Sequence, residues 1–287
     1  MTITLRQRLA NGEFIVAPGV YDMISALSAD RMGFPALYMT GYGTVASYLG
    51  LPDAGLASYR EMVDRVATIV GGTKTPVIAD ADTGFGGLLN VDHAVKGYER
   101  AGAAAIQIED QEFPKRCGHT PGRRVVPLED MVRKIRVAVE ARDSKDFLIV
   151  ARTDARTDLG LDEALRRGDA FAEAGADVLF IESPESEEEM ATIGSRFAGV
   201  PLLANIVEGG RTPVLPKSQL QELGYSISIH PASGFLATAA ACAGIYRTLH
   251  ETGASIDSAT PLLPFSEMNE LLGFPAVWDF EKRHPES

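Results

Sequence analysis

The sequence predicts an α/β fold in which parallel strands and helices alternate to form a (β/α)₈ barrel of the TIM type. Three observations support this prediction. Short apolar runs alternate with helical patterns along the chain, glycines recur at equivalent joints before strands, and no glycine-rich dinucleotide fingerprint is present. The missing fingerprint favours the barrel over an open, doubly wound sheet. The 287 residues are sufficient for one barrel domain.

Eight short apolar runs are the candidate strands, and most of them end in a polar or charged residue. They cover residues 14–18, 36–40, 76–82, 104–110, 147–153, 177–183, 201–205 and 225–229. Between them, segments such as 127–142 and 161–175 place apolar residues three and four positions apart, which is the spacing of a helix face. Alternating strands and helices in this number are the pattern of a closed barrel.

Three joints before strands follow one pattern. Gly33, Gly102 and Gly175 each lie seven positions before the polar residue that ends the next strand. Glycine ends a helix there because it accepts a left-handed conformation. We therefore expect one barrel domain over residues 1–287. A helical tail over about 254–287 is rich in large apolar groups, and we expect it either to pack on its own barrel or to be exchanged between subunits.

The composition excludes several classes of partner. A formal net charge of −12 disfavours nucleic acid and anionic membranes, because both repel an acidic surface. The two cysteines, Cys117 and Cys242, are too few for a disulfide framework, which indicates a reducing cytoplasm. The chain start shows no signal-peptide pattern. The Ala-rich stretch 234–245 is too short to span a bilayer and predicts a buried helix.

Carboxylates gather at the ends of the third and fourth candidate strands. Residues two apart in a strand point to the same side, so Asp80 and Asp82 are expected to share the inward face with Ile78. Glu109 ends the neighbouring strand with the same inward orientation, whereas Asp110 is expected in a loop or as a cap. Hard oxygen ligands favour Mg²⁺, with Mn²⁺ as the alternative. Without the third carboxylate, a solvated or Arg-paired aspartate pair would be the simpler interpretation.

A polar loop follows the fourth strand and contains Lys115, Cys117, Gly118 and His119. Its neighbouring cations would stabilise a thiolate at Cys117, while an ordinary thiol pKa of about 8.5 keeps much of it protonated at neutral pH. Cys117 is therefore a candidate proton donor or nucleophile. Cys242 lies in the Ala-rich segment, where an inert thiol is expected.

The other strand ends supply groups that suit an anionic substrate. Arginine grips a carboxylate with two parallel hydrogen bonds, and backbone N–H groups after a strand can bind a second one. The candidates are Thr40, Gly41, Tyr42, Arg152, Glu182 and Asn205. Each alone is more often structural than catalytic, but together at one end of a barrel they predict a site.

These residues resemble the isocitrate lyase/phosphoenolpyruvate mutase superfamily over most of the chain. The supporting motifs are TGYG at residue 40, DADTGFG at 80, IEDQ at 108, PKRCGH at 114, ARTDA at 151, IES at 181 and ANIVEGGRTP at 204. The pair DADTG and KRCGH is highly specific, and a cysteine in the second motif is typical of the carbon–carbon lyase branch.

The resemblance implies a role for each candidate. Asp80, Asp82 and Glu109 would hold Mg²⁺ directly or through water, and the segment 115–119 would be a mobile gating loop. Cys117 would protonate the enolate left by bond cleavage, with Tyr38 and a metal-linked water as candidates for the base. The implied catalytic residues are Cys117, Lys115, Tyr38, Arg152 and Glu182. The implied substrate-binding residues are Thr40, Gly41, Tyr42, Asp53, Gly118, His119, Arg152 and Asn205.

Two departures bear on the substrate. Val207 and Leu236 stand where methylisocitrate lyases have a hydroxyl residue and an arginine, which favours the branch that includes 2,3-dimethylmalate lyase and acts on smaller, substituted malates. The expected reaction cleaves such an acid to a 2-oxo acid such as pyruvate and a second carboxylic acid. The alternatives are an oxaloacetate hydrolase or decarboxylase, a phosphonomutase, and a dicarboxylate-binding barrel. The resemblance and the apolar tail predict a homodimer or homotetramer.

Overall fold

The computed structural model of the protein describes residues 3–118 and 122–285. The chain divides into two compact units, Met1–Gly234 and Phe235–Ser287. The strands of the described chain all lie in the first unit. The second unit contains the expected tail and begins earlier, inside helix α11 (Ser233–Thr252).

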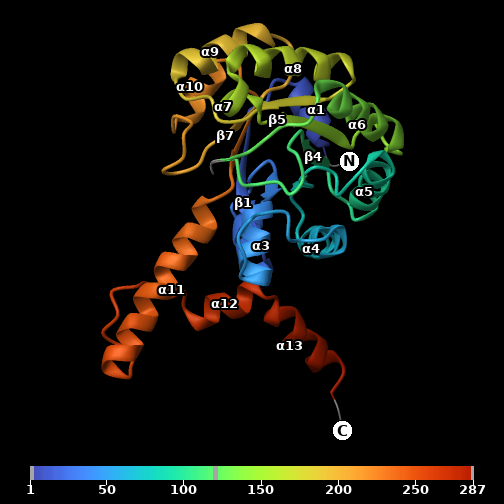
Figure 1. Ribbon diagram of the computed structural model, residues 1–287. Coiled ribbons are helices and arrows are strands. Elements are labelled where there is room, and N and C mark those ends of the chain that lie inside the picture. Colours follow the sequence, from blue (N-terminus) through green and yellow to red (C-terminus); the bar gives the residue numbers. More distant parts are fainter. Residues whose placement is uncertain (1–2, 119–121, 286–287) are drawn as a thin grey trace. The chain divides into compact units, whose positions relative to one another are not determined.

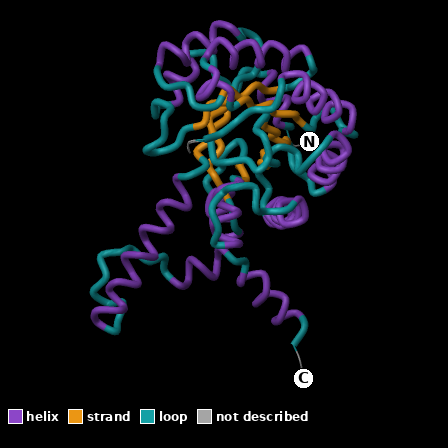
Figure 2. Tube along the Cα trace, in the orientation of Figure 1, coloured by secondary structure: helices purple, strands orange, loops and turns teal. Residues whose placement is uncertain are grey.

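The eight predicted strands are confirmed. They are β1 (Ile15–Val20), β2 (Leu37–Met39), β3 (Val77–Asp80), β4 (Ala105–Glu109), β5 (Leu148–Thr153), β6 (Val178–Ile181), β7 (Leu203–Asn205) and β8 (Ile227–His230). All pairs are parallel, in the order β6-β5-β4-β3-β2-β1-β8-β7. An isolated parallel bridge between Leu179 and Leu202 joins the two ends of this sheet. The predicted (β/α)₈ barrel is therefore present, nearly closed (Figures 1 and 2).

Helices connect the strands and cover the barrel. In the first unit they are α1 (Leu5–Ala10), α2 (Met23–Arg31), α3 (Gly41–Leu49), α4 (Tyr59–Gly72), α5 (Leu88–Arg100), α6 (Leu128–Ala141), α7 (Ala155–Leu159), α8 (Leu161–Glu173), α9 (Glu187–Arg196) and α10 (Lys217–Glu222). Helix α4 begins after Ser58, whose hydroxyl accepts the Glu61 N–H while the Glu61 carboxylate accepts the Ser58 N–H at 2.7 Å. Such a capping box satisfies backbone donors that a helix start leaves open.

Two apolar layers follow from the strand alternation. Side chains such as Ile78, Val150 and Phe180 fill the barrel interior, whereas Ile106 and Ile108 pack between strands and helices. Because side chains alternate along a strand, the next inward positions after the interior core lie at the strands' carboxyl ends. Among the polar residues predicted for the site, Asp80, Glu109, Arg152, Glu182 and Asn205 occupy those positions.

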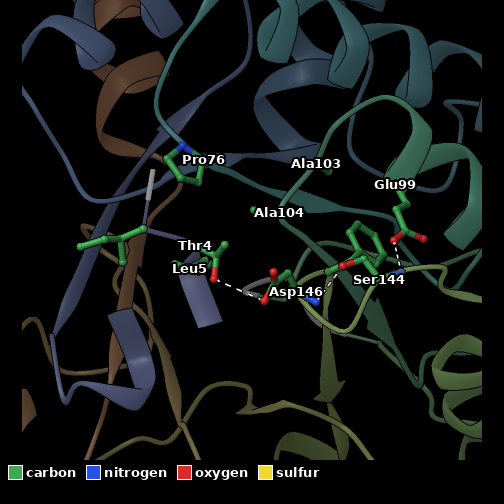
Figure 3. Close-up of a pocket in the computed structure, with 10 residues that line it drawn as sticks. Thr4, Leu5, Pro76, Glu99, Ala103, Ala104, Ser144 and Asp146 are labelled. Carbon is green, nitrogen blue, oxygen red and sulfur yellow. Dashed lines mark hydrogen bonds between the residues drawn. The ribbon is translucent and has the colours of Figure 1, made fainter. Parts of the chain in front are cut away.

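A pocket of about 300 Å³ lies at the opposite, amino-terminal end of the barrel (Figure 3). Pro76 and Ala104, which line it, directly precede β3 and β4. Glu99, which also lines it, accepts the N–H groups of Asp143 and Ser144, each at 2.7 Å. Catalytic groups of such barrels come from the carboxyl end, so this pocket lies at the end of the barrel that contributes to stability and not to catalysis.

The second unit consists of most of α11 with α12 (Phe265–Leu271) and α13 (Phe274–Arg283). The Ala-rich stretch is helical as predicted, but the expectation that it is buried is wrong, because no residue of α11 is buried. Large apolar side chains elsewhere in the unit are also open to solvent, with Ile256 87% and Phe265 81% exposed. Among the described residues, no helix is long and apolar enough to cross a membrane.

Candidate active site

Six neighbouring strands bring their polar ends together at the carboxyl end of the barrel. The side chains that β2 to β7 contribute there, at or directly after the strand, are buried: Tyr38, Asp80, Glu109, Arg152, Glu182 and Asn205. Their convergence follows from the inward alternation described above, since neighbouring parallel strands end at the same edge.

Asp80 ends β3 and is held by two backbone donors. Its Oδ2 accepts the Gly41 N–H at 3.2 Å, and its Oδ1 accepts the Asp82 N–H at 3.0 Å. Asp82 lies beyond the strand, with a left-handed φ of 49°. The expectation that strand alternation places Asp82 is therefore corrected, because a turn after β3 places it. Gly41 must be glycine here, since a Cβ would lie 2.5 Å from Asp80 Oδ2.

Lys115 joins two acidic residues of different loops. Its buried ammonium lies 2.6 Å from Asp53 Oδ1 and 2.7 Å from Asp82 Oδ1. The Cys117 N–H donates to the Asp53 carbonyl at 3.3 Å, so the same loop is tied to the segment after β2 by its backbone as well. These contacts dock the cysteine-bearing segment on the carboxylate cluster.

Arg152 stands among carboxylates at the end of β5. Its Nε and Nη2 each donate to the Asp154 carboxylate at 2.9 Å, in the two-point geometry that arginine favours. Its Nη1 lies 3.2 Å from Glu109 Oε2, and its Nε lies 3.6 Å from Glu182 Oε2. The guanidinium also stacks over Phe180, 5.1 Å from the ring centre. Arg152 is thus fixed in orientation from several sides.

Gly118 lets the cysteine loop approach Arg152. A Cβ on Gly118 would lie 2.5 Å from Arg152 Nη2 and 2.9 Å from Glu182 Cδ. The Ser183 hydroxyl donates to the Gly118 carbonyl at 3.1 Å. Cys117, the residue before, is half-buried. The structure therefore brings the predicted Cys117–Gly118 pair to the strand ends, whereas His119 lies outside the described residues.

Tyr38 lies inside the barrel mouth, and its hydroxyl donates to Gln107 Oε1 at 2.9 Å. Burial, followed by the charge of Asp80, raises the Tyr38 pKa well above its ordinary value. A phenol in this state remains protonated at neutral pH. Its position shows Tyr38 as a hydrogen-bond donor, and its use as the base stays a prediction.

The remaining predicted binding residues lie around this centre. The Thr40 hydroxyl accepts the Gly43 N–H at 3.4 Å and caps α3, while Tyr42 on the same helix is 39% exposed. Asn205 donates its side-chain amide to Glu182 Oε2 at 3.1 Å. Thr40 and Asn205 are buried at the strand ends, and Tyr42 is the more solvent-accessible member of the predicted set.

Burial dominates the protonation of the acidic cluster. It raises the Asp82 pKa to about 7, although the Lys115 charge acts in the opposite direction. It also raises the Glu109 pKa well above its usual range, with Arg152 opposing. Crowded carboxylates disfavour one another's ionised form unless a cation compensates them. The cluster is therefore short of positive charge.

The donor set fits a divalent cation. One Glu109 oxygen, Oε1, is buried and accepts no hydrogen bond from the described residues. In the described ranges, no three His, Cys, Asp or Glu side chains converge into a ready-made metal group. Mg²⁺ keeps several waters and takes few protein ligands directly, so a site for it does not need three converging side chains. The residues that would hold it are those predicted: Asp80, Asp82 and Glu109.

The sequence reasoning missed a buried set of charges behind Arg152. Asp110 lies in the loop after β4, as expected, but it is fully buried. Its carboxylate accepts the Asp154 N–H at 2.9 Å and pairs with Arg167 at 2.8 Å. Arg123 pairs with Asp154 at 2.5 Å. Asp110 and Asp154 lie in the IEDQ and ARTDA motifs, so the sequence did draw attention to them. Nothing in the sequence distinguishes Arg123 from its neighbour Arg124.

Comparisons with known proteins agree with this geometry. The chain matches the family model described as phosphoenolpyruvate phosphomutase over residues 5–250. It is 48% identical over 280 residues to the 2,3-dimethylmalate lyase of Eubacterium barkeri, covering 98% of this chain and 96% of that protein. It is 44% identical over 284 residues to a 2-methylisocitrate lyase of Aeropyrum pernix, covering 99% and 90%.

A solved structure of oxaloacetate acetylhydrolase in complex with the inhibitor 3,3-difluorooxalacetate matches with a TM-score of 0.93 and 36% identity, covering 99% of this chain and 97% of that one. Both the family model and the two relatives cover most of the chain, including every strand and the acidic cluster. With the barrel and the site in place, the chain belongs to the phosphoenolpyruvate mutase/isocitrate lyase superfamily of enzymes.

Proposed function

We propose that the protein is a Mg²⁺-dependent carbon–carbon lyase that cleaves a substituted malate to a 2-oxo acid and a second carboxylic acid. The observation that carries this proposal is the docking of the Cys117 segment on the carboxylate cluster. Lys115, two residues before Cys117, contacts Asp82 at 2.7 Å, and the Cys117 N–H contacts the Asp53 carbonyl at 3.3 Å. A proton donor beside a cation-binding cluster suits the protonation of an enolate.

A metal at Asp80, Asp82 and Glu109 would supply Lewis-acid chemistry, which lowers the pKa of a substrate 2-hydroxyl and stabilises the oxygen of the 2-oxo product. The excess of buried carboxylate and the unpaired Glu109 oxygen support this part of the proposal. Arg152 and Lys115 supply positive charge around the reacting groups, where low dielectric strengthens their effect on an anion.

The bond that breaks joins C2, which bears the hydroxyl, to C3. The hydroxyl proton leaves to a base, its electron pair forms the C2 carbonyl, and the pair from the broken bond remains on C3 as the enolate of the second acid. The Cys117 thiol then gives its proton to C3. The donation of the Tyr38 hydroxyl to Gln107 supports a role for Tyr38 in orienting groups, and Tyr38 and a metal-linked water remain the candidates for the base.

The relatives and two positions of this chain support the proposed substrate class. The Eubacterium barkeri relative is named for 2,3-dimethylmalate, and Val207 and Leu236 replace polar groups expected for a tricarboxylate. Val207 directly follows the buried Ile206 after β7. An apolar residue there accommodates an alkyl substituent better than a third carboxylate.

The test is pyruvate release from a panel of substituted malates, 2-methylisocitrate and oxaloacetate, with Mg²⁺ and with EDTA. We expect metal-dependent pyruvate from a substituted malate, and weaker or no release from 2-methylisocitrate. If none of the malates is cleaved while 2-methylisocitrate is, the proposed specificity is wrong. If no acid releases pyruvate, the lyase proposal itself fails.

A second candidate is hydrolysis of oxaloacetate, favoured by the close structural match to oxaloacetate acetylhydrolase. Oxalate and acetate are the products of that reaction, so product analysis with oxaloacetate separates it from cleavage to pyruvate. A phosphonomutase is disfavoured by Cys117, because a mutase has no carbanion for the thiol to protonate.

A further inference from the structure

Two buried arginines share one carboxylate behind the site. We infer that Arg123 is a positioning residue that acts through Asp154 to orient Arg152 and to keep the Arg152 charge available to an anionic substrate. The expected effect of Arg123 on catalysis rests on the proposed function. Its geometry is independent of which acid is cleaved.

The Asp154 carboxylate is the joint between the two arginines. Its Oδ1 accepts from Arg152 Nη2 at 2.9 Å and from Arg123 Nη1 at 2.5 Å, while its Oδ2 accepts from Arg152 Nε at 2.9 Å. Arg123 also donates to the Thr157 hydroxyl. The side chains of Arg123 and Asp154 are 1% and 0% exposed, so water does not compete for these bonds.

The backbone of Asp154 is fixed separately. Asp110 Oδ1 accepts the Asp154 N–H at 2.9 Å, and Asp110 Oδ2 accepts the Thr153 hydroxyl at 2.7 Å. Arg167 completes this group by pairing with Asp110 at 2.8 Å. Because its main chain is held in this way, the Asp154 side chain can move only by rotation about its own bonds. The Arg123 contact opposes the rotation that would turn the Asp154 carboxylate away from Arg152.

Charge gives a second reason for Arg123. Burial alone disfavours the ionised form of Asp154, but the pKa of this carboxyl is lowered because Arg152 and Arg123 both lie beside it. If Arg152 were the only partner, Asp154 would neutralise most of its charge. With Arg123 sharing the carboxylate, Arg152 retains positive character on its other side.

That other side of Arg152 faces the candidate metal ligands. Arg152 Nη1 lies 3.2 Å from Glu109 Oε2. A substrate anion bound near Glu109 therefore meets the guanidinium in the plane that Asp154 sets. A tilt of that plane would weaken stabilisation of the anion in the transition state more than ground-state binding.

The experiment compares Arg123→Ala and Arg123→Lys with Arg124→Ala. Arg124 is the matched control, because it is the adjacent arginine but its side chain is 81% exposed and pairs with an exposed Glu112 at 2.8 Å. We expect Arg123→Ala to lower kcat by roughly 100-fold with little change in KM, as for a small misplacement of a catalytic group. Arg123→Lys and added guanidinium should each restore part of kcat, and Arg124→Ala should match wild type.

Two measurements separate this inference from the proposed function. Calorimetry measures the affinity for oxalate, a planar dianion, in the presence of Mg²⁺, and a crystal structure of Arg123→Ala shows the Arg152 guanidinium. If wild type cleaves no acid, the lyase proposal fails, but weaker oxalate binding and a displaced Arg152 in Arg123→Ala still support positioning. An unmoved Arg152 with unchanged oxalate affinity and unchanged kcat overturns it.

A third variant serves as the control for misfolding. Arg123→Gln keeps hydrogen-bond donors near Asp154 but removes the charge, so it carries the test if Arg123→Ala does not fold. If Arg123→Gln is soluble and unfolds at the wild-type midpoint, we expect its kcat to be lower than that of wild type, as for Arg123→Ala. Wild-type kcat in that variant would contradict the role of the charge.

Discussion

Lys115 Nζ lies 2.6 Å from Asp53 Oδ1, and this buried ion pair joins the cysteine loop to the segment after β2. The lysine also contacts Asp82 at 2.7 Å, so one ammonium holds carboxylates of two different loops. Removing one partner of a buried pair leaves an uncompensated charge, which is costly. The position of the described part of this loop, up to Gly118, therefore depends in part on this contact.

Asp53→Asn should loosen the cysteine loop without disturbing the barrel. We expect kcat/KM to fall by roughly 10- to 100-fold, because the thiol loses its fixed position relative to the substrate. The measurement is steady-state kinetics with the preferred acid. Asp64→Asn is the control, since the Asp64 side chain forms an exposed ion pair with Arg60 on α4 and its loss should leave kinetics unchanged. Equal kinetics in both variants would contradict the docking role.

Gly118→Ala tests the close approach of the loop to Arg152. The added Cβ would lie 2.5 Å from Arg152 Nη2, so either the loop or the guanidinium must move. We expect kcat/KM to fall by about 100-fold while the unfolding midpoint changes little. Gly71→Ala is the control, because a Cβ there meets nothing within 4 Å. A Gly118→Ala enzyme with wild-type kinetics would mean that the loop is not this close during turnover.

Cys117→Ala tests the proton donor directly. Loss of the thiol should reduce cleavage by about 100-fold or more, within the range of general acid catalysis, and leave binding of oxalate with Mg²⁺ nearly intact. Cys242→Ala is the control, as the other cysteine lies on α11 in the second unit. Full lyase activity in Cys117→Ala would remove Cys117 from the mechanism.

Because of His230, at the end of β8, we expect the free energy of unfolding to depend on pH. Its pKa is lowered mainly by burial, with the charge of Glu208 opposing. A histidine with a lowered folded-state pKa contributes stability above its unfolded pKa of about 6.5, and that stability is lost as pH falls below this value. Urea unfolding at pH 7.5 and 5.5 should therefore show a larger decrease for wild type than for His230→Asn. The same decrease in both proteins would exclude His230 as a source.

The exposed apolar side chains of the second unit lead us to expect self-association. Phe265 is 81% exposed and Trp278 is 47% exposed, and apolar surface of this kind is usually covered by a partner. We propose that a second copy covers it, giving a homodimer or homotetramer by light scattering. The double variant Phe265→Asp and Trp278→Asp should lower the mass, whereas Ile24→Asp, at an exposed residue of the barrel unit, should not. A monomeric wild type would contradict the proposal.

The sequence by itself determined the barrel and most of the candidate site. Strand alternation is a local rule, so inward positions such as Asp80, Glu109 and Arg152 could be assigned before the strands were assembled. The rule failed at Asp82, where the chain leaves the strand in a left-handed turn. It also failed for the Ala-rich helix, which was expected to be buried although none of its residues is.

The tertiary structure alone decided which charges are buried together. Arg123 and Arg124 are neighbours of the same type, yet their side chains are 1% and 81% exposed. Asp110, next to Glu109, faces Arg167 of α8 instead of the barrel mouth. Such pairings depend on distances between strands and helices that are far apart in the chain. They are set only when the barrel closes, and a pattern read along one segment cannot contain them.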